Sequence, residues 1–325
     1  MKKRITVIAI LVLLVVVGVF AAGCFKQFQP PKKVIGTSKP TATPAKAIDK
    51  KMSGTDMFMA GIENFYAADY VTTLLAGQVN VKIGALNVTQ FVFGTKIRDG
   101  KASTEQEKKD AVYYVDNKSY STFVQVYEET IVNQKATNAD DRVKYVSYSK
   151  RKYTEKDDPT GFGVDGWSKP KSTNGKSFES IAALVSEMKN DPTRIWMYNT
   201  TPETLASVSK VTVNNAGQYE FTIDLDINKA TEEYRQVMLH MLNASVSCKD
   251  EDLKFRSVQF TVKMWDNGFI SELGIKESYD VKIAGIISST ITLESVQQYS
   301  YDMNEKGYDI ASRLEASKSW PKNMK

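Results

Sequence analysis

The segment "KFRSVQFTVKMWDNGFISELGIKESY", Lys254–Tyr279, decides the fold class of this chain. Its first half alternates apolar and polar residues, which is the period of a half-buried β-strand. The apolar positions on the inward side are Val258, Phe260, Val262 and Met264. Asp-Asn-Gly follows and supplies the Asn-Gly dipeptide that tight hairpin turns prefer. The segment therefore predicts an antiparallel hairpin with one apolar side.

Strand patterns extend outward from this hairpin in both directions. The stretch "QYEFTIDLDI", residues 218–227, alternates most clearly, and residues 280–301 form another long strand pattern. Residues 71–153 are rich in Tyr, Val, Thr and Phe, which favours strands, and their turn signals divide them into four. We therefore expect an antiparallel sheet with one apolar face.

Helical periodicity occurs at residues 55–68, 177–188 and 229–242, and the tail after Tyr301 has room for one further short helix. Each segment carries one apolar stripe, and these helices are the elements available to cover the sheet. This predicts an α+β protein. Flexible methionines on such helices can fill a core or line an adaptable apolar cavity, and both alternatives stay open. The candidate lining residues are Met59, Ile62, Phe65, Met188, Phe221, Met238, Met241 and Phe260.

The amino terminus has the layout of a secretory signal. A basic start, Met1–Arg4, precedes an uncharged apolar run, Ile5–Ala22. Ala21-Ala22-Gly23 before Cys24 resembles the lipobox of bacterial lipoproteins, although that motif usually has Leu where Ala21 stands. The resemblance implies cleavage before Cys24 and acylation of its thiol, and an uncleaved signal anchor is the alternative.

With the cleavage that the resemblance implies, the chain divides into a signal peptide over 1–23, a lipidated Cys24 with a Lys/Pro/Thr-rich tether over 24–52 and a single extracytoplasmic domain over 53–318. The composition of the tether predicts that it is disordered. The tether carries seven lysines against one aspartate, whereas acidic residues outnumber basic ones 37 to 33 after Lys51. The basic tether suits an anionic membrane surface. The acidic balance of the rest argues against nucleic acid as a partner.

No motif indicates catalysis. His240 is the single histidine, so neither a His-pair metal site nor an ordinary Ser-His-Asp triad is expected. "GFGVDG", residues 161–166, lacks the strand and helix that a dinucleotide loop needs. Cys248 is expected to be a small buried residue. We therefore expect a non-enzymatic protein without cofactor or metal, although distant carboxylates could still form a hydrolase pair.

A cysteine in a lipobox-like context (Cys24), a tether, an early amphipathic helix and the "FTVKMWDNGFISELGIK" hairpin together resemble the LolA/LppX-like lipid-binding lipoproteins. The resemblance implies a long β-meander curled into a half barrel over a few helices, with acyl chains held between them. The leading hypothesis is thus a lipoprotein on the outer face of the bacterial membrane that binds or shields a lipid-like ligand. The alternatives are a structural or protein-interaction module and a carboxylate-based envelope hydrolase.

Overall fold

The computed structural model describes residues 35–104, 107, 110–120, 125–133, 135–137, 143–150, 198–232, 234–236, 238–239, 248–283, 287–303 and 310. The signal peptide, Cys24, the helix predicted over 177–188, His240 and Met241 lie outside these residues. The strands are β1 Tyr70–Ile83, β2 Leu86–Asp99, β3 Val112–Tyr120, β4 Gln125–Asn133, β5 Val143–Lys150, β6 Leu205–Val208, β7 Thr212–Val213, β8 Tyr219–Leu225, β9 Leu253–Met264, β10 Ile270–Ile283 and β11 Ile287–Ser300. The helices are α2 Gly54–Ala67 and α6 Ile227–Ala230, with short 3-10 turns at Pro202–Thr204 and Asp250–Asp252.

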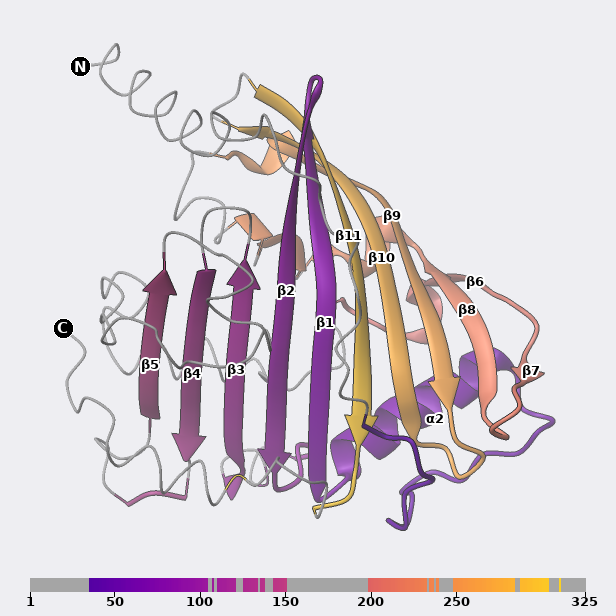
Figure 1. Ribbon diagram of the computed structural model, residues 1–325. Coiled ribbons are helices and arrows are strands. Elements are labelled where there is room, and N and C mark those ends of the chain that lie inside the picture. The colour runs from indigo at the N-terminus through magenta and orange to yellow at the C-terminus, as the bar shows by residue number, and fades with distance from the viewer. Residues whose placement is uncertain are drawn as a thin grey trace.

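All the described strands belong to one open antiparallel sheet of eleven strands, ordered β5-β4-β3-β2-β1-β11-β10-β9-β8-β6, with β7 also paired to β8. Two meanders meet where the first strand pairs with the last, because Thr72 lies opposite Ser300 and Lys82 opposite Thr290. Figure 1 shows this junction at the centre of the sheet. The predicted antiparallel pairing is confirmed, and the described residues form mostly β-sheet with few helices.

The hairpin that decided the fold class forms as predicted. β9 and β10 pair through a turn at Trp265–Phe269, where Gly268 adopts a φ of +88° that favours glycine. One prediction for the first meander was wrong: residues 110–132 form two strands, β3 and β4, so that five strands stand where four were expected. Neither glycine nor proline occurs between β3 and β4, so the sequence lacked the usual turn signal.

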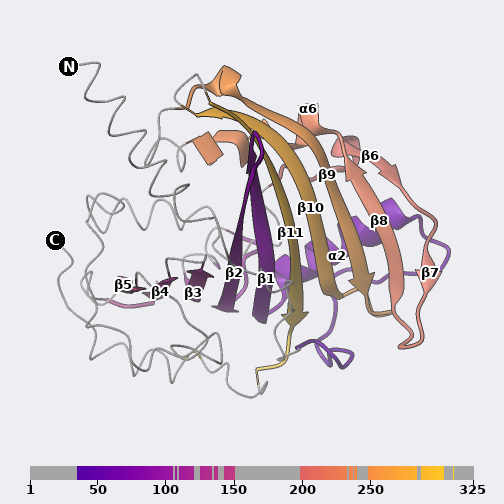
Figure 2. The same ribbon diagram turned by 45° about the horizontal axis from the view of Figure 1, so that its top comes forward.

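Helix α2 begins one residue before the predicted start and lies against one side of the sheet. Ser53 caps it, accepting a hydrogen bond from the Asp56 amide at 3.1 Å. Figure 1 shows α2 crossing behind β11, β10, β9 and β8, and Figure 2 shows the strands curving in the same region. A Cβ on Gly61 would lie 2.8 Å from Ile270 Cγ1, so the absence of a side chain allows close packing. We call this side of the sheet the inner face and the opposite side the outer face.

The expectation of a single apolar face was wrong for part of the sheet. On β8–β11 the buried apolar side chains face α2, but β1–β4 also carry a buried cluster on the outer face. The strand register assigns these residues to that face, because Tyr70, Leu74, Ile97, Val112, Tyr114 and Ile131 alternate with the residues that face α2. Ile35 and Ile310 join this cluster.

The prediction of a disordered tether up to residue 52 does not hold for residues 35–52. This segment runs along the end of the sheet that carries the β9–β10 turn: Ile35 is buried, and Lys39 forms a 2.5 Å ion pair with Asp266. Asn64 of α2 accepts from the Lys46 amide and donates to the Lys46 carbonyl and to that of Gly268. Specific hydrogen bonds thus order a stretch whose composition alone gives no period.

Candidate functional site

The predicted cavity-lining residues that the structure describes lie in or against the main core. Phe65 of α2, Phe221 of β8 and Phe260 of β9 are at most 3% exposed and belong to one cluster on the inner face. Ile62 and Met238 are half-buried against that cluster, and Met59 is half-buried without belonging to it. Met188 and Met241 lie outside the described residues.

These aromatic side chains pack against other side chains. The Phe65 ring lies 5.8 Å from the ring of Tyr299, and the Phe260 ring lies 6.1 Å from that of Phe58. A side chain that lined an empty cavity wide enough for water would keep accessible surface, whereas Phe65 and Phe260 keep none. The three phenylalanines are therefore neighbours within a filled core.

A buried carboxyl group lies beside this core on β10. Glu277 is 4% exposed, and its Oε1 and Oε2 accept hydrogen bonds from Tyr234, at 3.2 Å, and from Tyr198. The two tyrosine rings are 4.7 Å apart. Burial raises the pKa of Glu277 from 4.5 to about 8, so that the carboxyl is mostly protonated at neutral pH. The same burial raises the pKa of Tyr234 above its ordinary value.

The sequence analysis missed this group, although alternation could have revealed it. Glu277 lies on the same side of β10 as Leu273, Ile275 and Tyr279, all of which face inward. A protonated carboxyl between two tyrosine hydroxyls fixes the segments at Tyr198 and Tyr234 to the sheet. It functions as a polar tie in the core, because the hydrogen bonds that the structure gives it come from tyrosines.

Cys248 is buried as predicted, at 5% exposure, in a small cluster with Leu239, Leu253 and Tyr279. Burial raises the pKa of its thiol, and Asp252 and Asp250 raise it further. A thiol with a raised pKa is a poor nucleophile at neutral pH. This agrees with the packing role expected for Cys248.

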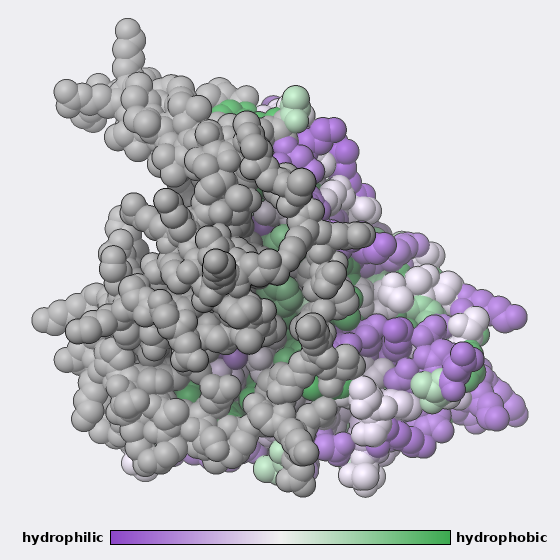
Figure 3. All heavy atoms as spheres, viewed as in Figure 1, coloured by the Kyte–Doolittle hydropathy of each residue, from purple (hydrophilic) through white to green (hydrophobic). Residues whose placement is uncertain are grey.

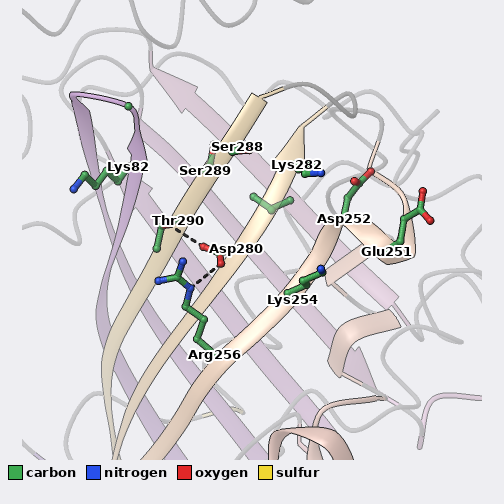
Figure 4. Close-up of a pocket in the computed structure, with 12 residues that line it drawn as sticks. Lys82, Glu251, Asp252, Lys254, Arg256, Asp280, Lys282, Ser288, Ser289 and Thr290 are labelled. Atoms are coloured by element: carbon green, nitrogen blue, oxygen red, sulfur yellow. Dashed lines mark hydrogen bonds and ion pairs between the residues drawn. The ribbon is translucent and has the colours of Figure 1, made fainter.

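A polar hollow of about 460 Å³ lies at the end of the sheet opposite the β9–β10 turn. Figure 4 shows charged side chains from β1, β9, β10 and the segment before β9 around it. Asp280 lies at its centre, accepting a hydrogen bond from Thr290 at 2.9 Å and pairing with Arg256 at 2.7 Å. The lining residues are Lys82, Gly84, Glu251, Asp252, Lys254, Arg256, Asp280, Val281, Lys282, Ser288, Ser289 and Thr290.

Among the residues that the structure describes, no group of three or more His, Cys, Asp or Glu side chains is placed to hold a metal ion. In the same part of the chain, no helix combines the length and apolar character needed to cross a bilayer. The hollow was not predicted, because its residues come from segments up to about 200 positions apart in sequence that only the pairing of β1 with β11 brings together.

Comparison with known proteins gives only weak similarities. No protein-family model matches the chain, and neither does any curated protein. DynF from the dynemicin biosynthesis pathway of Micromonospora chersina shares 8% identity with a TM-score of 0.19, covering 71% of this chain and 79% of its own. The translocator domain of the autotransporter NalP from Neisseria meningitidis shares 7% identity with a TM-score of 0.20, and the match covers 75% of this chain and 92% of that domain. The attachment invasion locus protein Ail of Yersinia pestis shares 5% identity with a TM-score of 0.12, covering 72% and 99%. Similarities at these scores support no argument about fold or function.

Proposed function

We propose that this chain is a non-enzymatic lipoprotein, anchored through Cys24 at the outer face of the bacterial membrane. Its sheet domain serves as an interaction module that binds a charged component of the cell envelope. The lipobox-like sequence before Cys24 supports the anchor. The binding surface is the outer face of β8–β11, which carries no helix among the described elements.

The observation that carries this proposal is the contrast between the two faces of β9 and β10. Inward side chains such as Phe260 and Leu273 are fully buried, whereas outward ones such as Lys254 and Lys276 are exposed. Hydrophilic residues cover most of the described surface over β8–β10 in Figure 3. A filled inner core leaves the outer face as the part of this half that is open to a partner.

Binding of an apolar ligand is the second candidate, and Met238 is the observation that favours it. This flexible side chain is half-buried and contacts two of the core clusters, so that a small movement of its segment would open the space between them. The half-barrel arrangement would then be β8–β11 curled around α2, with the acyl chain beneath Tyr234 and Met238. Opening breaks the hydrogen bond from Tyr234 to Glu277, which opposes it.

Mass spectrometry of the full chain purified from bacterial membranes tests both candidates. We expect a polypeptide that begins at Cys24 with a covalent diacylglycerol group, and no further lipid after gentle detergent exchange. Retention of residues 1–23 would overturn the lipoprotein anchor. A lipid bound noncovalently in one-to-one ratio and recovered by organic extraction would replace the interaction module with the apolar-ligand candidate.

A further inference from the structure

We propose that the polar hollow on the outer face binds a soluble polymer with repeated phosphate groups. Lys82, Lys254 and Lys282, which we call the lysine row, supply the charge. All three are exposed, and none forms an ion pair with any residue that the structure describes. This inference rests on the proposed function, because it names the chemistry of the envelope component that the module binds.

Strand register fixes the geometry of the row. Lys82 lies opposite Thr290, Thr290 opposite Asp280, and Asp280 opposite Lys254. These four positions cross four neighbouring strands, so that the first and last lysines stand about 14 Å apart at the usual spacing between strands. Lys282 lies two residues beyond Asp280, opposite Ser288. A single phosphate ion is too small to contact both ends of this row, whereas a chain of phosphates can.

The acidic residues of the hollow are mostly engaged. Asp280 pairs with Arg256, and Glu251 pairs with Lys249 at 3.3 Å. Asp252 accepts a 3.4 Å hydrogen bond from the Lys249 amide, which leaves its negative charge in the hollow. The lysine row therefore brings three positive charges against the one carboxylate that has no ion pair among the described residues. The hydroxyl group of Ser288 lies between the lysines and can donate a further hydrogen bond to a phosphate oxygen, whereas that of Thr290 already donates to Asp280.

The position of the row favours a soluble polymer over the headgroups of the anchoring membrane. Ile35, where the described chain begins, belongs to a cluster with Tyr70 at the opposite end of the sheet. Lys82 is twelve residues further along β1, which is about 40 Å in an extended strand. The segment from Cys24 to Ile35 spans at most roughly 40 Å when fully extended. The lysine row can reach the bilayer that holds Cys24 only if the segment from Cys24 to Ile35 is almost fully extended or if the domain lies flat on the membrane. Either arrangement costs the chain conformational freedom.

The test is calorimetric titration of linear polyphosphate into the full chain in dodecyl maltoside micelles, with and without phosphatidylglycerol. The row variant carries Lys82→Gln, Lys254→Gln and Lys282→Gln. The matched control carries Lys50→Gln, Lys51→Gln and Lys210→Gln, which remove the same charge from exposed lysines elsewhere. We expect binding by wild type and control to be alike, and binding by the row variant to be at least about tenfold weaker at low salt, with a shallower salt dependence because fewer counterions are released.

The proposal would be overturned if the wild type did not bind polyphosphate, or if the row variant and the control lost the same affinity for it. It would also be overturned if inorganic phosphate competed as strongly as the polymer at equal phosphate concentration. Suppression of polymer binding by phosphatidylglycerol would assign the row to lipid headgroups and refute the polymer. The intact mass of the same preparation reports on Cys24. An acylated protein that fails to bind polyphosphate therefore refutes this site and leaves the anchor standing.

Discussion

Strands β1–β3 bury both of their faces in the halves that carry Tyr70, Ile97 and Val112, whereas β9 and β10 bury one. On β1, Val71 faces α2 and Thr72 faces the other way, yet both are completely buried. On β10, Ile275 is 6% exposed while the side chain of its neighbour Lys276 is 66% exposed. One continuous sheet thus combines a two-sided interior with an exposed polar face. The difference shows that burial along a strand depends on what the tertiary structure places over each face.

The largest expected effect concerns the carboxyl of Glu277. It lies on the inner face of β10, in the half of the sheet that buries only one face. Between pH 4.5 and about 8 folded Glu277 keeps a proton that the unfolded chain releases. The stability that this group contributes is therefore fully present below pH 4.5 and is lost as pH rises toward 8, by about 1.4 kcal/mol per pH unit. We expect Glu277→Gln to remove this loss, so that the variant gains on wild type as pH rises.

Urea unfolding at a series of pH values measures this difference. Glu63→Gln removes an exposed carboxyl of α2 and serves as the control, with an expected change within about 0.5 kcal/mol. A constant difference between Glu277→Gln and wild type from pH 5 to pH 8 would show that the carboxyl is ionised in the fold, and the tie to Tyr198 and Tyr234 would need another explanation.

Paired substitutions test the two-sided interior directly. Ile97→Ala on the outer face of β2 should cost about 2–5 kcal/mol, and Val71→Ala on the inner face of β1 should also be costly, because each leaves a cavity. On β10 only the inner position should respond: Ile275→Ala should cost several kcal/mol, and Lys276→Ala at most about 0.5 kcal/mol. The free energy of unfolding of each variant, measured by urea titration and compared with wild type, tests these expectations. A small effect of Ile97→Ala would refute burial of the outer face at β2.

The elements that the sequence predicted correctly are those whose signals are local. The β9–β10 hairpin has alternation and an Asn-Gly turn within one segment, and α2 has a serine cap and a helical period. The predicted apolar face of α2 was less accurate. Met59 is only half-buried, whereas Met57 and Phe58 are completely buried, because α2 crosses strands whose direction its own sequence does not specify.

The outer cluster and the polar hollow could not be predicted, because both depend on pairing over long distances in sequence. Asp280 and Thr290 each look like a polar strand position by themselves. They become the centre of a charged surface only when β1 joins β11 and brings Lys82 beside them. Glu277 differs, since its inward position followed from the alternation around it and could have been recognised.

Arg98 links strand β2 to helix α2, and its removal should have an intermediate effect on stability. From β2 its guanidinium donates to the carbonyls of Phe65 and Tyr66 at the end of α2, and it lies 5.4 Å from the Phe65 ring. Arg98→Met keeps the length but loses these hydrogen bonds, which should cost about 2–3 kcal/mol. Hydrogen exchange should become faster in the last turn of α2 and stay unchanged in the first turn, at Met57. Equally faster hydrogen exchange along the whole helix would mean that the variant is destabilised globally and that Arg98 does not act as a local cap of α2.

Gly268 in the β9–β10 turn should tolerate substitution poorly, at a somewhat smaller cost. Its φ of +88° is strained for other residues, and an added Cβ would lie 2.7 Å from Asn64 Nδ2. Gly268→Ala should destabilise the fold by about 1–3 kcal/mol. Gly84, which also has a positive φ but open space around it, provides the matched control, and its alanine variant should cost less. Thermal unfolding of both variants separates the backbone strain from the steric contact, and an equal loss would show that the contact with Asn64 contributes nothing.

The smallest effect on stability is expected from the ion pair on the exposed outer face of β9 and β10. It separates residues that stabilise the fold from residues that are available for binding. Arg256 and Asp280 form a 2.7 Å ion pair, but their side chains are 58% and 38% exposed, so solvent screens the attraction. A double-mutant cycle of Arg256→Gln and Asp280→Asn should give a coupling free energy below about 1 kcal/mol. A coupling of several kcal/mol would make the hollow part of the folding core. A weak coupling leaves its charged residues free to be selected for a ligand, since the sheet beneath them gains its stability from the inner face.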